Sequence, residues 1–309
     1  MSKINYYIKS IFHFRLFRNI IYKYRCNKLY RKKLTDKDYL VELGKIRLNY
    51  IMNLDNPQTF NEKLNWYKLN YCTDLMKKVV DKIYAKEYVK SKGLGNILIS
   101  TIKTYDSIND IKLNELPKKF VIKNSMDSGG VFVCKDINKI SKNDIVDKLK
   151  VVVNFRNGKH VNREYAYTEN NNKIIVEELL ETPDNHAPWD YKFFCFDGEP
   201  KALFVATERD TNVKIDFYDI NFNWLPFWRG HKNNKLIRPS KPKNYDKMIE
   251  ICRILSKDFP FVRVDLYNID GNIKFGELTF YPGAGFEPFN PKKWDKIFGD
   301  FWNLNNIKK

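Results

Sequence analysis

The sequence predicts an α+β fold in which two or three lobes share one cleft. Its 309 residues exceed the usual length of one domain, and a hydrophobic content of 43% with 15% aromatic residues is enough for packed cores. The first part of the chain has helical spacing, and short β-runs separated by glycine and asparagine follow it. These runs pair as hairpins between helices without a regular βαβ alternation, which argues against a Rossmann sheet.

Residues 36–95 follow helical spacing, with almost no glycine before the end of the segment. The TFNEKL stretch at 59–64 has the chemistry of a helix start, with Thr59 or Asn61 as the cap and a glutamate near the positive end. A further helix is expected over 74–92, where a pair of glycines ends it.

The β-rich part of the chain begins with a strand at 97–105. Further strands and hairpins are expected at 120–123, 130–136, 174–180, 191–208, 216–227 and 261–282. The hairpins at 191–208 and 261–282 each turn at an Asp-Gly pair. Helical spacing returns at 139–165, with a polar break at 154–160, and again at 244–257.

Cysteine and histidine usage argues against zinc. The five cysteines are widely spaced, odd in number and without a CxxC pair, which fits a reducing compartment rather than a disulfide framework. The four histidines are scattered and form no HExxH helix. A cytoplasmic location is therefore expected.

Positive charge is concentrated in residues 1–35, which hold ten basic residues and no acidic one. Without these ten, the 55 basic residues fall to 45 against 37 acidic ones, a net charge of +8, so a nucleic-acid-binding body is not expected. Charges interrupt every apolar run, which predicts neither a signal peptide nor a transmembrane span. Three alternatives remain for this arm: docking on the anionic cytoplasmic face of a membrane, packing on the body as a helix, and binding nucleic acid.

The segment FVIKNSMDSGGVFVC at 120–134 has the features of a phosphate-binding hairpin. Lys123 ends one strand, and a loop with two glycines leads to the next. Glycines let backbone N–H groups approach phosphate oxygens closely, and the lysine adds a point charge. The alternative is an ordinary hairpin with a Gly-Gly turn. A P-loop is excluded as the means of holding ATP, because the sequence has no GxxxxGK[ST] string.

The segment RVDLYNIDGNIKFGELTFYPGAG at 263–285 suits a divalent cation. Pairing about its Asp-Gly turn places Asp265 roughly opposite Glu277, and a cation relieves the repulsion between two facing carboxylates. Arg263 projects to the same face and is placed to touch a transferred phosphoryl group. The alternative is a solvated face with an Asp–Arg ion pair, which the apolar surroundings disfavour.

Two weaker signals come from the rest of the chain. The strand IIVEELL at 174–180 ends in acids and is followed by Asp190 and Lys192, an arrangement that can present backbone groups to adenine and a carboxylate to ribose. Lys82 lies early in the helical run 79–89, where a solvated surface lysine is the preferred alternative.

Taken in order, these pieces resemble the ATP-grasp superfamily. The likeness is to D-alanine–D-alanine ligases and, more closely, to the TupA-like branch associated with teichuronopeptide and surface-polysaccharide genes. It spans about residues 50–300, and the order and spacing of its motifs make it specific. The motifs are NPQTFNEKLNWYKL (56–69), VDKIYAKEYV (80–89), FVIKNSMDSGG (120–130), IIVEELLE (174–181), DYKFFCFDGEPK (190–201), DFYDINFNWLPF (216–227), FPFVRVDLY (259–267) and FGELTFYPGAGFEPFNP (275–291).

The resemblance implies an ATP-grasp fold, in which two α+β subdomains clasp ATP after a helical N-terminal region. The implied divisions are a basic aromatic arm at 1–35, a helical region at 36–110, a small subdomain at 111–173, and a large subdomain with the metal site at 174–309.

The resemblance also implies roles for individual residues. The ATP-binding candidates are Lys82, Lys123, Ser128, Gly129, Gly130, Glu177, Glu178, Leu180, Asp190 and Lys192. The candidates for holding Mg²⁺ are Asp265, Glu277 and Thr279. The catalytic candidates are Arg263, Arg209 and Lys214. Because Thr279 stands where the superfamily usually has asparagine, the number of magnesium ions stays open.

The activity that the resemblance implies is an ATP-dependent carboxylate–amine ligase acting through an acyl phosphate. ATP and Mg²⁺ are the expected cofactors, and a small-molecule or glycan carboxylate and an amine are the expected substrates. The expected setting is capsule, O-antigen or teichuronopeptide-type polysaccharide biosynthesis in the cytoplasm, peripheral to the membrane if the arm docks there. No nucleic-acid partner is expected.

Other activities remain as alternatives. A glycosyltransferase would fit the polysaccharide setting, and Asp36-Lys37-Asp38 is formally a DxD string, although we interpret it as a capping turn before a helix. A kinase would keep the nucleotide site and phosphorylate a hydroxyl. A non-catalytic scaffold is disfavoured, because the charged positions of the nucleotide site are present.

Overall fold

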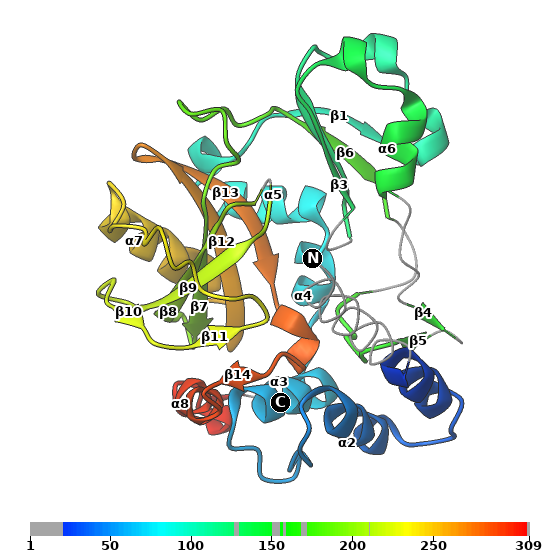
Figure 1. The fold of residues 1–309 in the computed structure, drawn as a ribbon, viewed down its shortest axis with the longest axis vertical. Helices are drawn as coiled ribbons and strands as arrows, with labels where there is room; N and C mark the ends of the chain where they lie inside the picture. The colour runs from blue at the N-terminus through cyan, green and yellow to red at the C-terminus, as the bar shows by residue number, and fades with distance from the viewer. Residues whose placement is uncertain are drawn as a thin grey trace, which may run out of the picture.

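The computed structural model describes residues 21–126, 130–149, 155–156, 159–167, 172–209 and 211–307. Two antiparallel sheets dominate it, one of four strands and one of six (Figure 1). The predicted α+β architecture is confirmed. Within the described ranges, no helix is long and apolar enough to cross a lipid bilayer.

The N-terminal region is helical, as predicted. Its helices are α2 (Asp36–Arg47), α3 (Phe60–Asn70), α4 (Asp74–Val79) and α5 (Lys82–Ser91). α2 and α3 lie at one end of the molecule, and α4 and α5 lie near its middle (Figure 1). α3 begins with a capping box, in which Thr59 Oγ1 accepts from the Glu62 N–H and the Glu62 carboxylate accepts from the Thr59 N–H. The DKD string forms the first turn of α2, after the cap Thr35, which confirms its interpretation as a helix start.

The helix expected over 74–92 is divided in two. The Asp81 side chain accepts from the Ile83 N–H at 2.7 Å and so caps a new helix, α5, instead of continuing α4. This break makes Lys82 the first residue of α5.

The small sheet has the strand order β1-β6-β2-β3, and each neighbouring pair is antiparallel. Its strands are β1 (Thr101–Tyr105), β2 (Phe120–Asn124), β3 (Val131–Cys134) and β6 (Ile174–Glu177). Helix α6 (Lys142–Leu149) covers one face, with Ile145 buried among Phe120 and Ile122. The region boundaries expected at 110/111 and 173/174 divide this sheet. They assign β1 and β6 to other regions than β2 and β3, although all four strands share the sheet.

The large sheet has the order β10-β9-β8-β7-β12-β13. Its strands are β7 (Asp190–Phe196), β8 (Glu199–Thr207), β9 (Lys214–Asp219), β10 (Trp224–Leu225), β12 (Phe261–Ile269) and β13 (Asn272–Thr279). Both predicted Asp-Gly turns are present. Their residues have positive φ, 48° and 82° at 197–198 and 51° and 93° at 270–271, as a two-residue hairpin turn requires.

Helices cover the large sheet. α7 (Tyr245–Ser256) packs on β7, β8 and β12. Phe60 of α3 meets the rings of Phe194 and Phe261 edge-to-face, and Phe298 of α8 (Lys293–Asp300) joins the same aromatic core. A short pair, β11 (Trp228–Arg229) and β14 (Phe289–Asn290), lies nearby. Single-turn 3-10 helices occur at Gly95–Ile97, Ile108–Asp110, Leu113–Glu115, Ile137–Lys139 and Leu304–Asn306. Pro282–Gly285 is a tight turn in which Gly283 and Ala284 have positive φ.

The helical spacing predicted over 139–165 holds for α6, which ends at Leu149. The polar break predicted at 154–160 contains β4 (Phe155–Arg156) and β5 (Lys159–His160), which pair as an antiparallel ribbon. The sequence between these strands is Asn157-Gly158, a strong hairpin signal. The prediction is wrong at 161–165, where the chain forms turns and irregular structure instead of a helix.

Candidate functional site

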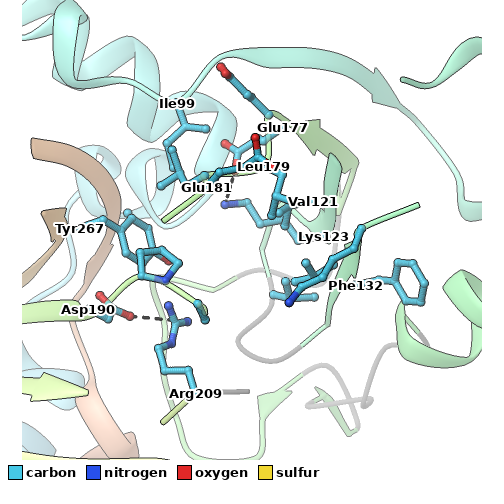
Figure 2. Close-up of a pocket in the computed structure, with 18 of the residues that line it drawn as sticks. Ile99, Val121, Lys123, Phe132, Glu177, Leu179, Glu181, Asp190, Arg209 and Tyr267 are labelled. Carbon is cyan, nitrogen blue, oxygen red and sulfur yellow. Dashed lines mark ion pairs between the residues drawn. The ribbon is translucent and has the colours of Figure 1, made fainter. Parts of the chain in front are cut away.

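A cavity of about 1200 Å³ is walled by residues of both sheets and of α5 (Figure 2). Most of the predicted nucleotide, metal and catalytic residues meet in it. Those that line it are Lys82, Lys123, Glu177, Glu178, Leu180, Asp190, Lys192, Arg209, Asp265 and Glu277. The structure therefore brings together positions that are up to 195 residues apart in a chain of 309.

On the small-sheet side, Glu177 is held between two lysines. Lys123 Nζ lies 2.5 Å from Glu177 Oε2, and Figure 2 shows the two side chains pointing at each other. Lys86 of α5 pairs with the other carboxylate oxygen and also donates to the Ile99 carbonyl and to Thr101 Oγ1, at 2.7 Å each. Burial favours the neutral forms of Glu177 and Lys123, but their mutual attraction lowers the pKa of Glu177 and raises that of Lys123.

Sequence reasoning missed Lys86. A signal existed, because Lys86 follows Lys82 by four residues, and residues at that spacing lie on the same face of a helix. On sequence alone it could not be told from the many surface lysines of this chain.

On the large-sheet side, Asp190 stands at the start of β7 beside two cations. Lys192 Nζ is 2.8 Å from Asp190 Oδ2, and Arg209 Nη2 is 3.7 Å from the same oxygen. The Arg209 guanidinium also lies over the Tyr267 ring, 5.6 Å from its centroid. Asp190 Oδ1 is buried and has no hydrogen-bond partner within the described ranges. It is an unsatisfied hydrogen-bond acceptor on a residue that lines the cavity.

Asp265 and Glu277 face each other across the β12–β13 hairpin, as predicted. The register shifts at a β-bulge between Asp265 and Leu266, and this shift places Glu277, rather than Gly276, opposite Asp265. A Cβ on Gly276 would lie 3.0 Å from the Asp265 carbonyl oxygen, so the close backbone approach at the bulge favours glycine.

Arg263 lies behind these two carboxylates, outside the residues that line the cavity. Its guanidinium donates to both oxygens of Asp265 at 2.7 Å, to Thr279 Oγ1 at 2.9 Å and to Glu277 Oε1 at 3.3 Å. Thr279 in turn donates to Glu277 at 3.2 Å. Arg263 therefore orients the carboxylate pair, and the expected direct contact with a transferred phosphoryl group stays a prediction.

The two facing carboxylates have opposite pKa shifts. Burial raises the pKa of Asp265 to about 6 in spite of Arg263 and Lys192. Burial acts in the same direction on Glu277, but Lys192, Lys82 and Arg263 together hold its pKa well below the usual value. Opposed shifts in one pair of carboxylates are common at functional sites.

The donor set fits magnesium that arrives with a nucleotide. No group of three or more His, Cys, Asp or Glu residues gathers at a metal-binding distance within the ranges that the structure describes. Two carboxylates and a threonine hydroxyl are therefore too few for a metal held by protein alone. Mg²⁺ commonly binds through one or two carboxylates and completes its shell with substrate phosphates and water.

The remaining predicted residues lie elsewhere. Gly130 accepts a backbone hydrogen bond from Asn124 at 3.1 Å and does not line the cavity. Lys214 begins β9 and is also outside the cavity lining, and its catalytic role stays a prediction. Ser128 and Gly129 lie outside the described residues.

Comparison with known proteins gives one family and a set of distant structures. A family model described as TupA-like ATPgrasp matches residues 62–303. No curated protein matches the chain.

Solved structures with a similar fold include ATP-grasp ligases. The D-alanine–D-alanine ligase from Bacillus anthracis complexed with ATP matches at 14% identity and a TM-score of 0.38, covering 66% of this chain and 54% of that one. The D-alanine–D-alanine ligase from Helicobacter pylori matches at 13% identity and a TM-score of 0.39, covering 74% and 60%. The ligase PsnB with its minimal precursor, Mg and ADP matches at 11% identity and a TM-score of 0.38, covering 71% and 57%. The chain thus spans less than two thirds of the length of these proteins.

Proposed function

The chain belongs to the TupA-like ATP-grasp family, and from that premise we propose that it is an ATP-dependent carboxylate–amine ligase. The observation that carries the proposal is the composition of the cavity. One wall presents the facing carboxylates Asp265 and Glu277 with Lys192 between Asp190 and Asp265, and another presents Lys123. Cations that surround an acidic pair suit a polyphosphate with its magnesium.

The size of the cavity supports two ligands. Pockets for one small molecule usually measure about 300–1,000 Å³. At about 1200 Å³, this cavity has room for a nucleotide and for a second substrate beside its phosphates. A ligase needs that space, because the acceptor carboxylate must lie in line with the γ-phosphoryl group.

In the proposed reaction, a carboxylate oxygen of the substrate attacks the γ-phosphorus of ATP. The bond to the β-phosphate breaks, and ADP leaves with the electron pair. The amine nitrogen then attacks the acyl carbon, loses a proton, and expels inorganic phosphate as the amide forms. Mg²⁺ held by Asp265 and Glu277 would neutralise charge on the phosphates.

The chain's own residues bind and orient these reactants. Lys123 and Lys82 bind phosphate oxygens, and Asp190 Oδ1 accepts a hydrogen bond from a ribose hydroxyl. Arg263 keeps the two metal-binding carboxylates in place. The protein thus contributes mainly positioning and charge compensation, as in phosphoryl transfer generally.

We further propose that the carboxylate and the amine are small molecules or glycan units used in surface-polysaccharide synthesis. The TupA-like resemblance supports this setting. The substrates to try first are amino acids, amino sugars and uronic acids.

The test is a hydroxylamine trap. Purified protein with Mg-ATP and this panel should release ADP and inorganic phosphate in equal amounts, and hydroxylamine in place of the amine should yield a hydroxamate. Asp265→Asn and Glu277→Gln should each lose this product, whereas Lys247→Ala, an exposed lysine of α7, should retain it. Arg263→Lys tests the need for the two hydrogen bonds that the Arg263 guanidinium donates to Asp265, because an ammonium group cannot replace a bidentate guanidinium.

The other outcomes point to other enzymes. ADP without free phosphate would indicate a kinase that phosphorylates a hydroxyl. Transfer from a sugar nucleotide with no consumption of ATP would indicate a glycosyltransferase. Either result would overturn the ligase proposal.

A further inference from the structure

Residues 21–33 carry an exposed basic surface remote from the cavity. Residues 21–30 are helical, and no acidic residue precedes Asp36 in the sequence. Figure 1 shows this segment at the edge of the molecule, beside α2. Its exposed cations are Lys23, Arg25, Lys28, Arg31, Lys32 and Lys33.

Within the part of the chain that the structure describes, the helix has one face that packs on the protein and one that does not. On the inner face, Leu29 is buried in a cluster with residues of α2, and the Tyr30 ring meets the Tyr39 ring edge-to-face at 6.3 Å. The outer face follows the spacing i, i+3, i+4, i+7 and consists of Ile21, Tyr24, Arg25 and Lys28. The packing of the inner face explains how the helix is held on the protein. It does not explain the composition of the outer face.

The outer face combines exposed apolar side chains with positive charge. The Tyr24 side chain is 65% exposed and Ile21 is 42% exposed, and cations surround both. An aromatic ring and an aliphatic chain gain by entering the boundary between lipid headgroups and acyl chains, while lysine and arginine meet anionic headgroups. A nucleic-acid backbone offers the negative charge but no apolar layer for Ile21.

We propose that residues 21–33 dock this protein on an anionic lipid surface. The inference is independent of the ligase activity, because no residue of this segment lines the cavity.

Binding to vesicles tests the proposal with the full chain. The protein should bind vesicles of phosphatidylcholine mixed with phosphatidylglycerol, and it should bind pure phosphatidylcholine vesicles far more weakly. High salt should release it, since the screening length falls from about 10 Å at 0.1 M to about 3 Å at 1 M. Binding that is equal for both kinds of vesicle would overturn the proposal.

Matched charge variants locate the surface. Arg25→Gln, Lys28→Gln and Arg31→Gln combined should weaken binding to the mixed vesicles roughly a hundredfold, because each cation near an anionic surface contributes about fivefold. Lys201→Gln, Lys247→Gln and Lys257→Gln combined remove the same charge from exposed positions elsewhere and should leave binding unchanged. Equal binding by the two triple variants would overturn the assignment.

Two further measurements keep the result unambiguous. All six substituted side chains are exposed, so both triple variants should unfold at the wild-type temperature. If one variant is destabilised, the salt and lipid comparisons on the wild-type protein still test the proposal. A duplex DNA offered in competition should not displace the protein from mixed vesicles. Displacement by DNA would instead assign the segment to nucleic acid.

Discussion

Glu177 is the residue on which the charge balance of the small-sheet wall depends. Its two oxygens pair with two different lysines, Lys123 from β2 and Lys86 from α5. If a phosphate engages Lys123, Lys86 remains to compensate the buried carboxylate. If one lysine had to serve both the phosphate and the Glu177 carboxylate, one of these two anions would have no compensating charge. An unpaired buried charge is costly.

Replacing Lys86 by methionine should therefore weaken Mg-ATP binding roughly tenfold, which corresponds to about 1.4 kcal/mol. The remaining lysine, Lys123, would be held by Glu177 and less available to phosphate. Titration calorimetry of the variant measures the effect. Lys90→Met, an exposed lysine one turn further along the same helix that does not line the cavity, is the control. Equal dissociation constants for wild type and Lys86→Met would contradict this role.

The sequence indicated most of the site residues but not their pairings. Lys123 was identifiable because it lies near the end of a strand, before a glycine-rich loop. Asp265 and Glu277 were identifiable because pairing about the Asp-Gly turn places them roughly opposite each other. Lys86 was not, and the position of Arg263 behind the carboxylates was not, because both depend on which side chains are desolvated together. That information arises only when the two sheets and α5 are assembled.

At the scale of elements, the β12–β13 hairpin shows what local rules capture. The Asp-Gly turn fixes the pairing near it, and Ile269 pairs with Asn272 as expected for a two-residue loop. Continued without a break, that register would oppose Asp265 to Gly276. The bulge adds one residue and brings Glu277 into place, and only the glycine within a strand hinted at it.

The short ribbon β4–β5 leads into a buried polar turn that should make stability depend on pH. His160 Nδ1 accepts from the Asn162 N–H at 3.2 Å, which requires a ring that is neutral at this nitrogen. Burial lowers the pKa of His160 to about 4, and Lys68 and Arg163 act in the same direction. Glu164, whose pKa burial raises to about 6, faces the ring from the other side, with 3.7 Å between Glu164 Oε2 and His160 Nε2.

Between the ordinary histidine value and about 4, the unfolded chain binds a proton that the folded chain does not. The His160 contribution is thus intact at neutral pH and is lost as pH falls. The loss of stability between neutral pH and about pH 4.5 should amount to roughly 2.5 kcal/mol. Urea unfolding of wild type and His160→Gln, at neutral pH and at about pH 4.5, isolates the His160 contribution. The stability contribution of Glu164 has the opposite pH dependence, but it is present in both proteins. If the difference between the two proteins does not change with pH, His160 does not titrate in this way.

At the scale of the whole molecule, the cavity joins parts of the chain that have separate cores. The small sheet packs around Phe120 and Ile122, and the large sheet around Phe60 and Phe194. Sequence patterns predicted both sets of strands, but the expected boundaries at 110/111 and 173/174 followed chain order. In the structure, β1 and β6 share a sheet with β2 and β3, which lie between them in the sequence. Local spacing contains no information on such long-range pairing.

A ligand that contacts both walls should stabilise the whole molecule. At a concentration about one hundred times its dissociation constant, Mg-ATP should add ~2.7 kcal/mol to the free energy of unfolding. Thermal or urea unfolding with and without Mg-ATP measures this gain, with GTP and UDP-glucose for comparison. Lys123→Ala should lose most of it, whereas Lys247→Ala should keep it. A gain that is undiminished in Lys123→Ala would place the phosphates elsewhere.

The ion pairs inside the cavity imply that nucleotide binding is an exchange of partners. Lys123 already holds Glu177, and Lys192 already holds Asp190 and Asp265. An incoming phosphate must compete with a protein carboxylate for each lysine, and an incoming magnesium ion must compete with a lysine for its carboxylate. At the Lys192–Asp265 pair, a phosphate and a magnesium ion that arrive together can each take the partner that the other releases, whereas either one alone would deprive one buried charge of that pair of its partner. The cavity should therefore bind phosphate and magnesium together more readily than either alone. It should take up Mg-ATP far more readily than free ATP or free Mg²⁺.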